Sequence, residues 1–195
     1  PDVFTAFRKK VEKYAEIRPA IPTPESIVTP ELPDTPVPMF SELGMEKVPA
    51  DERGVLTFKG GAVAGDDRLD HYLWGSDAVA SYKETRNGLI GADYSTKFSP
   101  WLANGSMSPR TIYHELERYE KEVTKNKSTY WVKFELLWRD YFKYVTMKYG
   151  RKIFFPGGIQ DKLVSWRDND TLFQKWRNGE TGDDFVDANM RELKE

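Results

Sequence analysis

The stretch STYWVKFELLWRDYFKYVTMKYG, from Ser128 to Gly150, decides the fold of this chain. It contains no proline, and its only glycine is the last residue. Apolar and aromatic side chains fall on nearly all sides of a helix drawn over these residues, which is typical of a helix at the centre of a domain. We therefore predict a long central helix that ends at Gly150.

Polar residues on the same helix raise a second question. Glu135, Trp138, Arg139 and Phe142 stand at i, i+3, i+4 and i+7, so they share one stripe of the helix. A charge on a buried helix is costly unless it is paired or used. Two interpretations stay open: an ion pair between Glu135 and Arg139, or the polar floor of a pocket in which Trp138 is a stacking surface.

The rest of the chain is also helical in pattern. Ser108 and Pro109 match the N-cap and first position of a helix, and apolar residues recur at helical spacing as far as Val123. No alternating pattern typical of β-strands is present, so we predict an all-α fold. Further helices are predicted over residues 3–16, 61–74 and 77–85.

A proline-rich segment separates the first of these helices from the others. Residues 19–38 contain seven prolines, which favours an extended, polyproline-like chain with no packing of its own. We interpret this segment as a connector laid over a surface rather than as a recognition motif.

Composition excludes several classes of protein. The net charge of −2 argues against a broad basic surface that coats nucleic acid, so any such contact must be local. The chain has no cysteine, which excludes disulfides, thiolate metal sites and a cysteine nucleophile. With only His71 and His114, we expect no metal site, and without a long apolar run we expect no membrane contact.

The segment DYSTKFSP, Asp93 to Pro100, surrounds a lysine with hydroxyl side chains just before a predicted helix. Hydroxyl and backbone N–H groups in such a loop can bind an anion, and Lys97 adds positive charge. The residues alone leave two interpretations open, namely a phosphate-binding loop and an ordinary hydroxyl-rich loop.

Three blocks of sequence carry a family resemblance. YKETRNGLIGADYSTKFSPWLANGSMSPR, then FELLWRDYF, then TGDDFVDANMREL resemble the cryptochrome/photolyase family, and most of all its cryptochrome-DASH branch. The resemblance covers nearly the whole chain. It implies that residues 51–195 form the N-terminal half of the helical FAD-binding domain, truncated at its C-terminus. It also implies that residues 1–50 are a helix and connector from a missing α/β antenna domain.

The resemblance assigns roles residue by residue. Arg86 would face the DNA backbone, while Glu135 and Trp138 would form the catalytic pocket that receives a flipped pyrimidine dimer. Trp166, ten residues before Trp176, would be the outermost tryptophan of an electron-transfer chain, although a plain surface tryptophan is an equal alternative. The flavin contacts implied in this way are Tyr82, Ser95, Thr96, Lys97, Phe98, Ser99 and Arg139.

The function implied by the resemblance is blue-light-driven repair of cyclobutane pyrimidine dimers by reduced FAD, with a preference for single-stranded DNA. A folate antenna, an intracellular location and dependence on the remaining polypeptide are further expectations, and we expect this fragment alone to be inactive. Two alternatives remain open: a blue-light photoreceptor that binds FAD and nucleic acid without repair, and a helical scaffold without cofactor. Absorbance between 350 and 500 nm would separate the scaffold from the other two.

The chain departs from the family pattern in its third block. Asp183-Asp184 stands where the family usually has an apolar or aromatic residue followed by proline. An acidic side chain can still cap the helix that begins there, so we expect the helix to form.

Overall fold

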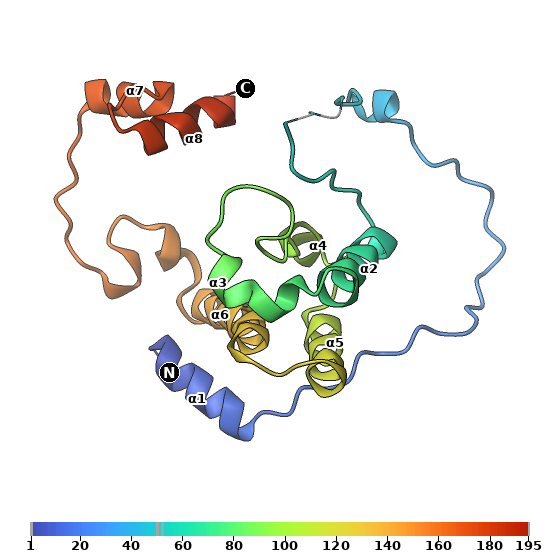
Figure 1. The fold of residues 1–195 in the computed structure, drawn as a ribbon. Helices are drawn as coiled ribbons and strands as arrows, with labels where there is room; N and C mark the ends of the chain where they lie inside the picture. Colours follow the sequence, from blue (N-terminus) through green and yellow to red (C-terminus); the bar gives the residue numbers. More distant parts are fainter. Residues whose placement is uncertain (1, 50, 52, 195) are drawn as a thin grey trace. The chain divides into compact units, whose positions relative to one another are not determined.

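The computed structural model describes residues 2–49, 51 and 53–194. Its described elements are all helical, as predicted (Figure 1). The chain divides into two compact units, one up to Tyr144 and one from Val145 onward, and each is described by itself. None of the described helices has the length and apolarity needed to cross a bilayer. Among the described residues no three His, Asp or Glu side chains are grouped so that they could hold a metal ion.

Six α-helices begin in the first unit among its described residues, joined by short helical turns and loops, and the last turn of the sixth lies beyond Tyr144 (Figure 1). A π-helical turn, His71–Gly75, continues directly from the second α-helix, and a 3₁₀ turn, Ala78–Ser81, leads into the third. A further 3₁₀ turn covers Phe40–Leu43. The α-helices are α1 Phe4–Tyr14, α2 Ala62–Asp70, α3 Tyr82–Thr85, α4 Ser99–Asn104, α5 Pro109–Glu122 and α6 Lys127–Tyr149.

These elements confirm the helices predicted over 3–16, 61–74, 77–85 and 128–150, and the start at Ser108 and Pro109. The Ser108 hydroxyl accepts a hydrogen bond from the Arg110 N–H at 3.2 Å, as an N-cap should. The short helix α4 was not predicted, because six residues are too few to show a helical period.

The core of the first unit lies where the π-turn, α5 and the beginning of α6 meet. Tyr72, Leu73, Ile112 and Leu116 are completely buried there, and Tyr119 is almost so. Burial of each such side chain contributes roughly 1.5–3 kcal/mol before the entropy of ordering is counted. This cluster packs α2, α3 and α4 against α5 and α6, and so fixes the loops between them.

The helix α6 is central only in its first half. Ser128, Thr129 and Val132 are buried, whereas Phe142 and Met147 are largely exposed. The expectation of burial on all sides is therefore wrong for the second half, where α1 covers Tyr141 through Phe4 and Phe7 while Phe142 and Met147 stay largely exposed.

Glycine permits a close approach between α2 and α4. A Cβ atom at Gly65 would lie 3.1 Å from Cγ of Trp101, so a larger residue would push the indole away. The indole is 3% exposed, and its Nε1 donates to the carbonyl oxygen of Lys59 at 2.9 Å. This packing fixes α4, and with it the loop that precedes α4.

The proline-rich segment is extended, as predicted, with no helix or strand between residues 15 and 39. Its beginning is tied to α5, because the Arg18 and Pro19 carbonyl oxygens contact ring and guanidinium nitrogens of α5. His114 Nε2 lies 3.0 Å from the Arg18 oxygen, and Arg110 donates to the Pro19 oxygen at 3.3 Å.

The second unit contains two packed helices, α7 Asp170–Asn178 and α8 Asp184–Lys194, after two short 3₁₀ turns. Asp183 Oδ1 accepts hydrogen bonds from the N–H groups of Phe185 and Val186 at 3.1 and 3.0 Å. An acidic side chain thus caps α8, as expected, although the capping residue is Asp183 and not the Asp184 that replaces the usual proline. The 3₁₀ turns are Gly150–Phe154 and Gly158–Gln160.

Candidate functional site

The hydroxyl-rich loop before α4 is organised by a buried arginine of α2. Arg68 is 6% exposed and donates to the carbonyl oxygens of Thr96 at 2.9 Å and Ser95 at 3.1 Å. It also donates to the Ala92 oxygen at 2.9 Å and pairs with Asp93 at 2.7 Å. One side chain therefore binds four points of the loop.

Asp93 completes this arrangement on its other oxygen. His71 Nε2 lies 3.0 Å from Asp93 Oδ2, while Arg68 holds Oδ1. Burial raises the pKa of Asp93, but the hydrogen bonds from His71 and Arg68 outweigh it and hold the pKa below its ordinary value. Asp93 is therefore an anion at neutral pH and keeps Arg68 in place.

The loop has hydrogen-bond donors that its own fold does not use. In the part of the chain that the structure describes, the hydroxyls of Ser95, Thr96 and Ser99 and the N–H groups of residues 95–98 make no hydrogen bond. The Ser95 and Thr96 carbonyl oxygens accept hydrogen bonds from Arg68, so the loop has more unused N–H and O–H donors than unused acceptors. Such a set fits an anion, and the diphosphate of FAD is one that it fits.

The two residues between these hydroxyls fix the shape of the loop. Lys97 adopts a left-handed backbone with φ of 58°, and its ammonium group lies 3.5 Å from the centre of the Tyr94 ring. Phe98 is 3% exposed and packs edge-on against Tyr72. Phe98 therefore anchors the loop in the core, and the ammonium group of Lys97 lies over the ring of Tyr94.

Three of the predicted site residues meet between α3 and α6. Arg86 donates to Oε1 of Glu135 at 2.6 Å, and its guanidinium group also lies 4.7 Å from the centre of the Trp131 ring. Tyr82 is 8% exposed. Burial first, and then the Glu135 carboxylate, raise the pKa of the Tyr82 hydroxyl, which therefore remains a donor at neutral pH.

This ion pair decides one of the questions left open by the sequence. Glu135 pairs with Arg86, 49 positions away, and Arg139 pairs with the neighbouring Asp140, at 3.5 Å. The interpretation of Glu135 and Arg139 as partners of one another is wrong. Arg139 is largely exposed, so the structure does not bring it into the group formed by Tyr82, Arg86 and Glu135.

Trp138 lies one turn beyond Glu135 on α6 and is half-buried among other rings. Phe4 of α1 stacks on it, with ring centres 3.5 Å apart and planes inclined by 11°. Phe134 and Tyr141 meet it edge-on. Trp138 thus lies one turn from Glu135 with one face covered by Phe4, while Phe142 also stacks with it at 5.3 Å.

The predicted electron-transfer residue lies in the second unit. Trp166 is 68% exposed and belongs to a stretch without helix, residues 161–169. Trp176 is 46% exposed and lies in ring contact with Phe173 on α7. Exposure of Trp166 is compatible both with exchange of an electron with solvent species and with a plain surface tryptophan.

Sequence reasoning missed Arg68, Asp93 and Phe4. Arg68 had a detectable signal, because it stands at i+4 from Ala64 and at i−4 from Tyr72 on the apolar side of α2. A charge in that position indicates a buried partner. Phe4 had no signal beyond its place as an apolar residue in the helix predicted over residues 3–16, since no sequence pattern shows which ring of another helix it meets.

Known proteins similar to this chain agree on one family. Residues 131–195 match the family described as the FAD binding domain of DNA photolyase. Cryptochrome DASH from Danio rerio is 53% identical over 99% of this chain and 38% of its own length. Cryptochrome DASH from Synechocystis is 49% identical over 99% of this chain and 40% of its own length.

A solved structure has the same fold as this chain. The crystal structure of a Synechocystis cryptochrome superimposes with a TM-score of 0.82 and 48% identity, covering all of this chain and 40% of that protein. The chain therefore spans about two fifths of the length of the proteins it matches. Together with the helical fold, these similarities show that the chain belongs to the cryptochrome/photolyase family, in its cryptochrome-DASH branch, and forms part of the FAD-binding domain.

Proposed function

We propose that this chain is part of a flavoprotein that repairs cyclobutane pyrimidine dimers in single-stranded DNA under blue light. The observation that carries the proposal is the placement of Glu135, held by Arg86 at 2.6 Å, one helical turn from the flat ring of Trp138. A carboxylate for a base edge beside an aromatic ring for stacking is the combination that a flipped base requires. FAD, when bound, reduced and excited by light, supplies the electron that splits the dimer.

The loop before α4 holds the FAD diphosphate in this proposal. The Ser95, Thr96 and Ser99 hydroxyls and the neighbouring N–H groups donate to phosphate oxygens, and Arg68 keeps the loop in shape from behind. Lys97 contributes only a screened charge, because its ammonium group lies over Tyr94. Tyr82, protonated and buried beside Glu135, is placed as a further contact.

Replacing Ser95 or Thr96 with alanine tests the loop in the complete protein. Each change removes one hydrogen bond to a phosphate and is expected to weaken FAD binding by about 1–2 kcal/mol, or about five- to thirtyfold. The measurement is the FAD dissociation constant by flavin fluorescence, with Lys97→Met as the matched control that is expected to change it less. Normal flavin affinity in the Ser95→Ala/Thr96→Ala protein would show that the loop is only structural.

Arg86 and Glu135 have different roles in the proposed pocket. Arg86 occupies Oε1 of Glu135, which leaves Oε2 as an acceptor for the edge of a base. The Arg86 guanidinium group is partly exposed and can also approach a DNA phosphate. Their ion pair joins α3 to α6, so the acceptor is held in place before DNA arrives.

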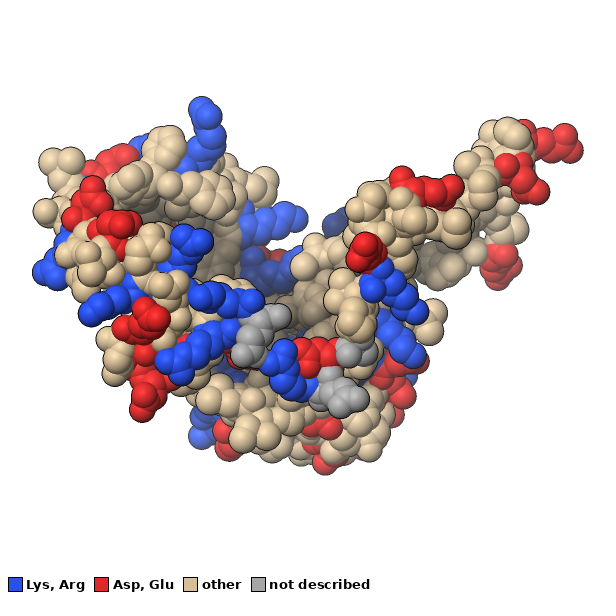
Figure 2. Space-filling model, turned by 90° about the horizontal axis from the view of Figure 1, so that it is seen from above, with Lys and Arg blue, Asp and Glu red and all other residues tan. Residues whose placement is uncertain are grey.

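Charge favours single-stranded DNA. On the face drawn in Figure 2, Lys and Arg side chains are interspersed with Asp and Glu side chains, in keeping with the net charge of −2. With a net charge of −2, this part of the protein gains little binding free energy from counterion release, so the cost of extruding a base from a duplex is harder to offset. A base in a single strand is already unpaired.

Trp138→Ala tests the pocket. Stacking of a base on an aromatic ring is worth about 1–3 kcal/mol, so affinity for dimer-containing single-stranded DNA should fall by about five- to 150-fold. Affinity for undamaged DNA and flavin content should stay near normal. The measurement is binding of both oligonucleotides together with repair yield per absorbed photon. Trp138→Phe, which keeps a smaller aromatic ring, should retain part of the affinity for the dimer. Equal losses on both oligonucleotides would mean that Trp138 only packs the core.

A photoreceptor without repair is the second candidate, and one observation favours it. Phe4 already lies against Trp138 at 3.5 Å, so one stacking face is taken by the chain itself. The repair assay separates the two, because a photoreceptor would bind FAD and DNA but return no repaired dimers under light. In either case Trp166, largely exposed, is the residue that we propose exchanges electrons with the surroundings.

A further inference from the structure

The face of Trp138 that Phe4 covers is closed to any ligand. The two ring centres lie 3.5 Å apart with planes only 11° from parallel, which is already contact distance for stacked rings. A base that stacks on the indole needs a free space of about one ring's thickness above that face. It can therefore reach this face of Trp138 only by removing Phe4.

Phe4 is itself firmly held. Its ring is 7% exposed and meets Phe134 edge-on at 5.2 Å and Tyr141 at 5.6 Å. The Tyr141 hydroxyl donates to the carbonyl oxygen of Asp2 at 2.9 Å, which ties the beginning of α1 to α6.

The far part of α1 is fixed to the same helix. Arg8 donates to the Tyr130 hydroxyl at 2.5 Å, and that hydroxyl donates to Glu12 at 2.7 Å. Phe142 also stacks near Trp138, but at 5.3 Å and 25°, and its own side chain is 59% exposed. The fixed support of the indole is therefore Phe4 and not Phe142.

We propose that Phe4 is a positioning residue, which sets the plane of Trp138 from behind so that a pyrimidine stacks on the face turned away from Phe4. The inference rests on the proposed function, because it names the residue that prepares the stacking surface. A ring held in plane before the base arrives loses less entropy on binding than one that must be ordered. Without Phe4, the indole can tilt into the space that the phenyl ring leaves.

The test uses the complete protein with FAD and three variants. Phe4→Leu keeps an apolar side chain but removes the flat face, and Phe4→Tyr keeps the flat face. Phe7→Leu is the matched control one turn along α1, where Phe7 contacts Tyr141 and not Trp138. Flavin content and thermal unfolding check that each variant is folded, and Phe4→Met replaces Phe4→Leu if the latter does not fold.

Two readouts follow for each variant. In protein labelled with 5-fluorotryptophan, the ¹⁹F resonance of residue 138, assigned with Trp138→Phe, should shift and broaden in Phe4→Leu alone. The ratio of affinities for dimer-containing and undamaged single-stranded oligonucleotides should fall about two- to tenfold in Phe4→Leu. Phe4→Tyr and Phe7→Leu should match the unmodified protein in both readouts.

The outcomes separate this inference from the proposed function. An unchanged resonance and affinity ratio in Phe4→Leu would overturn it, and so would an equal loss in Phe7→Leu, which would indicate general docking of α1. Tighter binding to the dimer in Phe4→Leu would also overturn it and would make Phe4 a competitor of the base. If the unmodified protein shows no preference for the dimer, the proposed function fails, and the resonance still decides whether Phe4 fixes the indole.

Discussion

Replacement of Arg68 with methionine is expected to lower the free energy of unfolding by about 3 kcal/mol and to weaken FAD binding by more than about tenfold. Removing one partner of a buried ion pair typically costs about 3–5 kcal/mol. The lower end applies because the side chain of Asp93 is 40% exposed and can recover water. Methionine fills much of the same volume, so loss of packing is a minor part of the effect.

The effect on FAD follows from the four contacts that Arg68 makes. Without its guanidinium group, the carbonyl oxygens of Ala92, Ser95 and Thr96 lose their donors, and the loop is free to turn these acceptors toward the phosphate. Acceptors facing an anion repel it, so the loop loses more than rigidity. Arg68→Met therefore weakens FAD binding through the loop, although Arg68 itself is not a proposed FAD contact.

Two control variants separate these causes. Arg68→Lys keeps the charge but not the planar fork, so we expect it to retain part of the stability and to lose most of the order of the loop. His71→Gln removes only the half-exposed partner of Asp93 and should change both quantities little. The measurements are urea unfolding and FAD titration of the complete protein, and equal effects of Arg68→Met and His71→Gln would contradict the role given to Arg68.

Most of the helices could be predicted because their signals are local. Capping at Ser108, the period of apolar residues in α1 and α5, and the absence of glycine and proline within α6 are properties of neighbouring residues. The exposure of the second half of α6 could not be predicted in the same way, since an apolar side chain such as Met147 has the same pattern whether or not a partner covers it.

The sequence singled out candidate site residues, whose roles stay predictions, but it could not show how they pair. The hydroxyl-rich loop and the group of Arg86, Glu135 and Trp138 were singled out from sequence blocks, yet the partner of Glu135 is Arg86, 49 residues away and directly after α3. An i,i+4 pair is the only kind that sequence spacing shows. The contact of Phe4 with Trp138, which joins opposite parts of the first unit's sequence, depends on how α1 packs and has no local signal.

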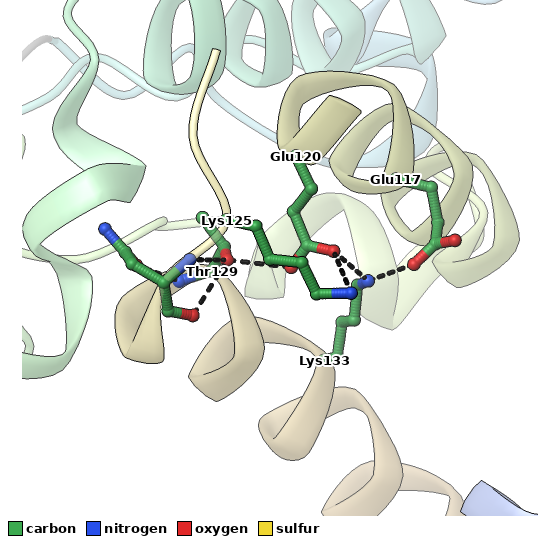
Figure 3. Close-up of polar contacts among 6 residues, drawn as sticks. Glu117, Glu120, Lys125, Thr129 and Lys133 are labelled. Carbon is green, nitrogen blue, oxygen red and sulfur yellow. Dashed lines mark hydrogen bonds and ion pairs between the residues drawn. The ribbon is translucent and has the colours of Figure 1, made fainter. Parts of the chain in front are cut away.

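A buried ion cluster between α5 and α6 leads to the second large effect (Figure 3). Lys133 of α6 pairs with Glu117 and, at 2.7 Å, with Glu120, both on α5. The side chains of Glu120 and Lys133 are only 5% and 14% exposed. The Thr129 hydroxyl also donates to Glu120, at 2.7 Å.

Electrostatics keep this cluster charged. Burial lowers the pKa of Lys133, but hydrogen bonds to Glu117 and Glu120 outweigh it and hold the pKa above its ordinary value. Lys133 therefore stays a cation at neutral pH and neutralises Glu120, a carboxylate almost without access to water. No residue of the proposed flavin or DNA site belongs to the cluster, so its role is to join the two helices.

Lys133→Met is accordingly expected to lower the free energy of unfolding by about 3 kcal/mol, because it leaves Glu120 buried without its main counter-charge. Lys125→Met is the matched control, since Lys125 lies 3.9 Å from the same carboxylate but is 78% exposed; it should cost less than about 1 kcal/mol. Adding Glu120→Gln to Lys133→Met should restore part of the loss, because a neutral amide can still accept the Thr129 hydrogen bond. Urea unfolding followed by tryptophan fluorescence measures all three. Equal losses for the two lysine variants would mean that water screens the cluster and that burial of Glu120 is not what makes Lys133 necessary.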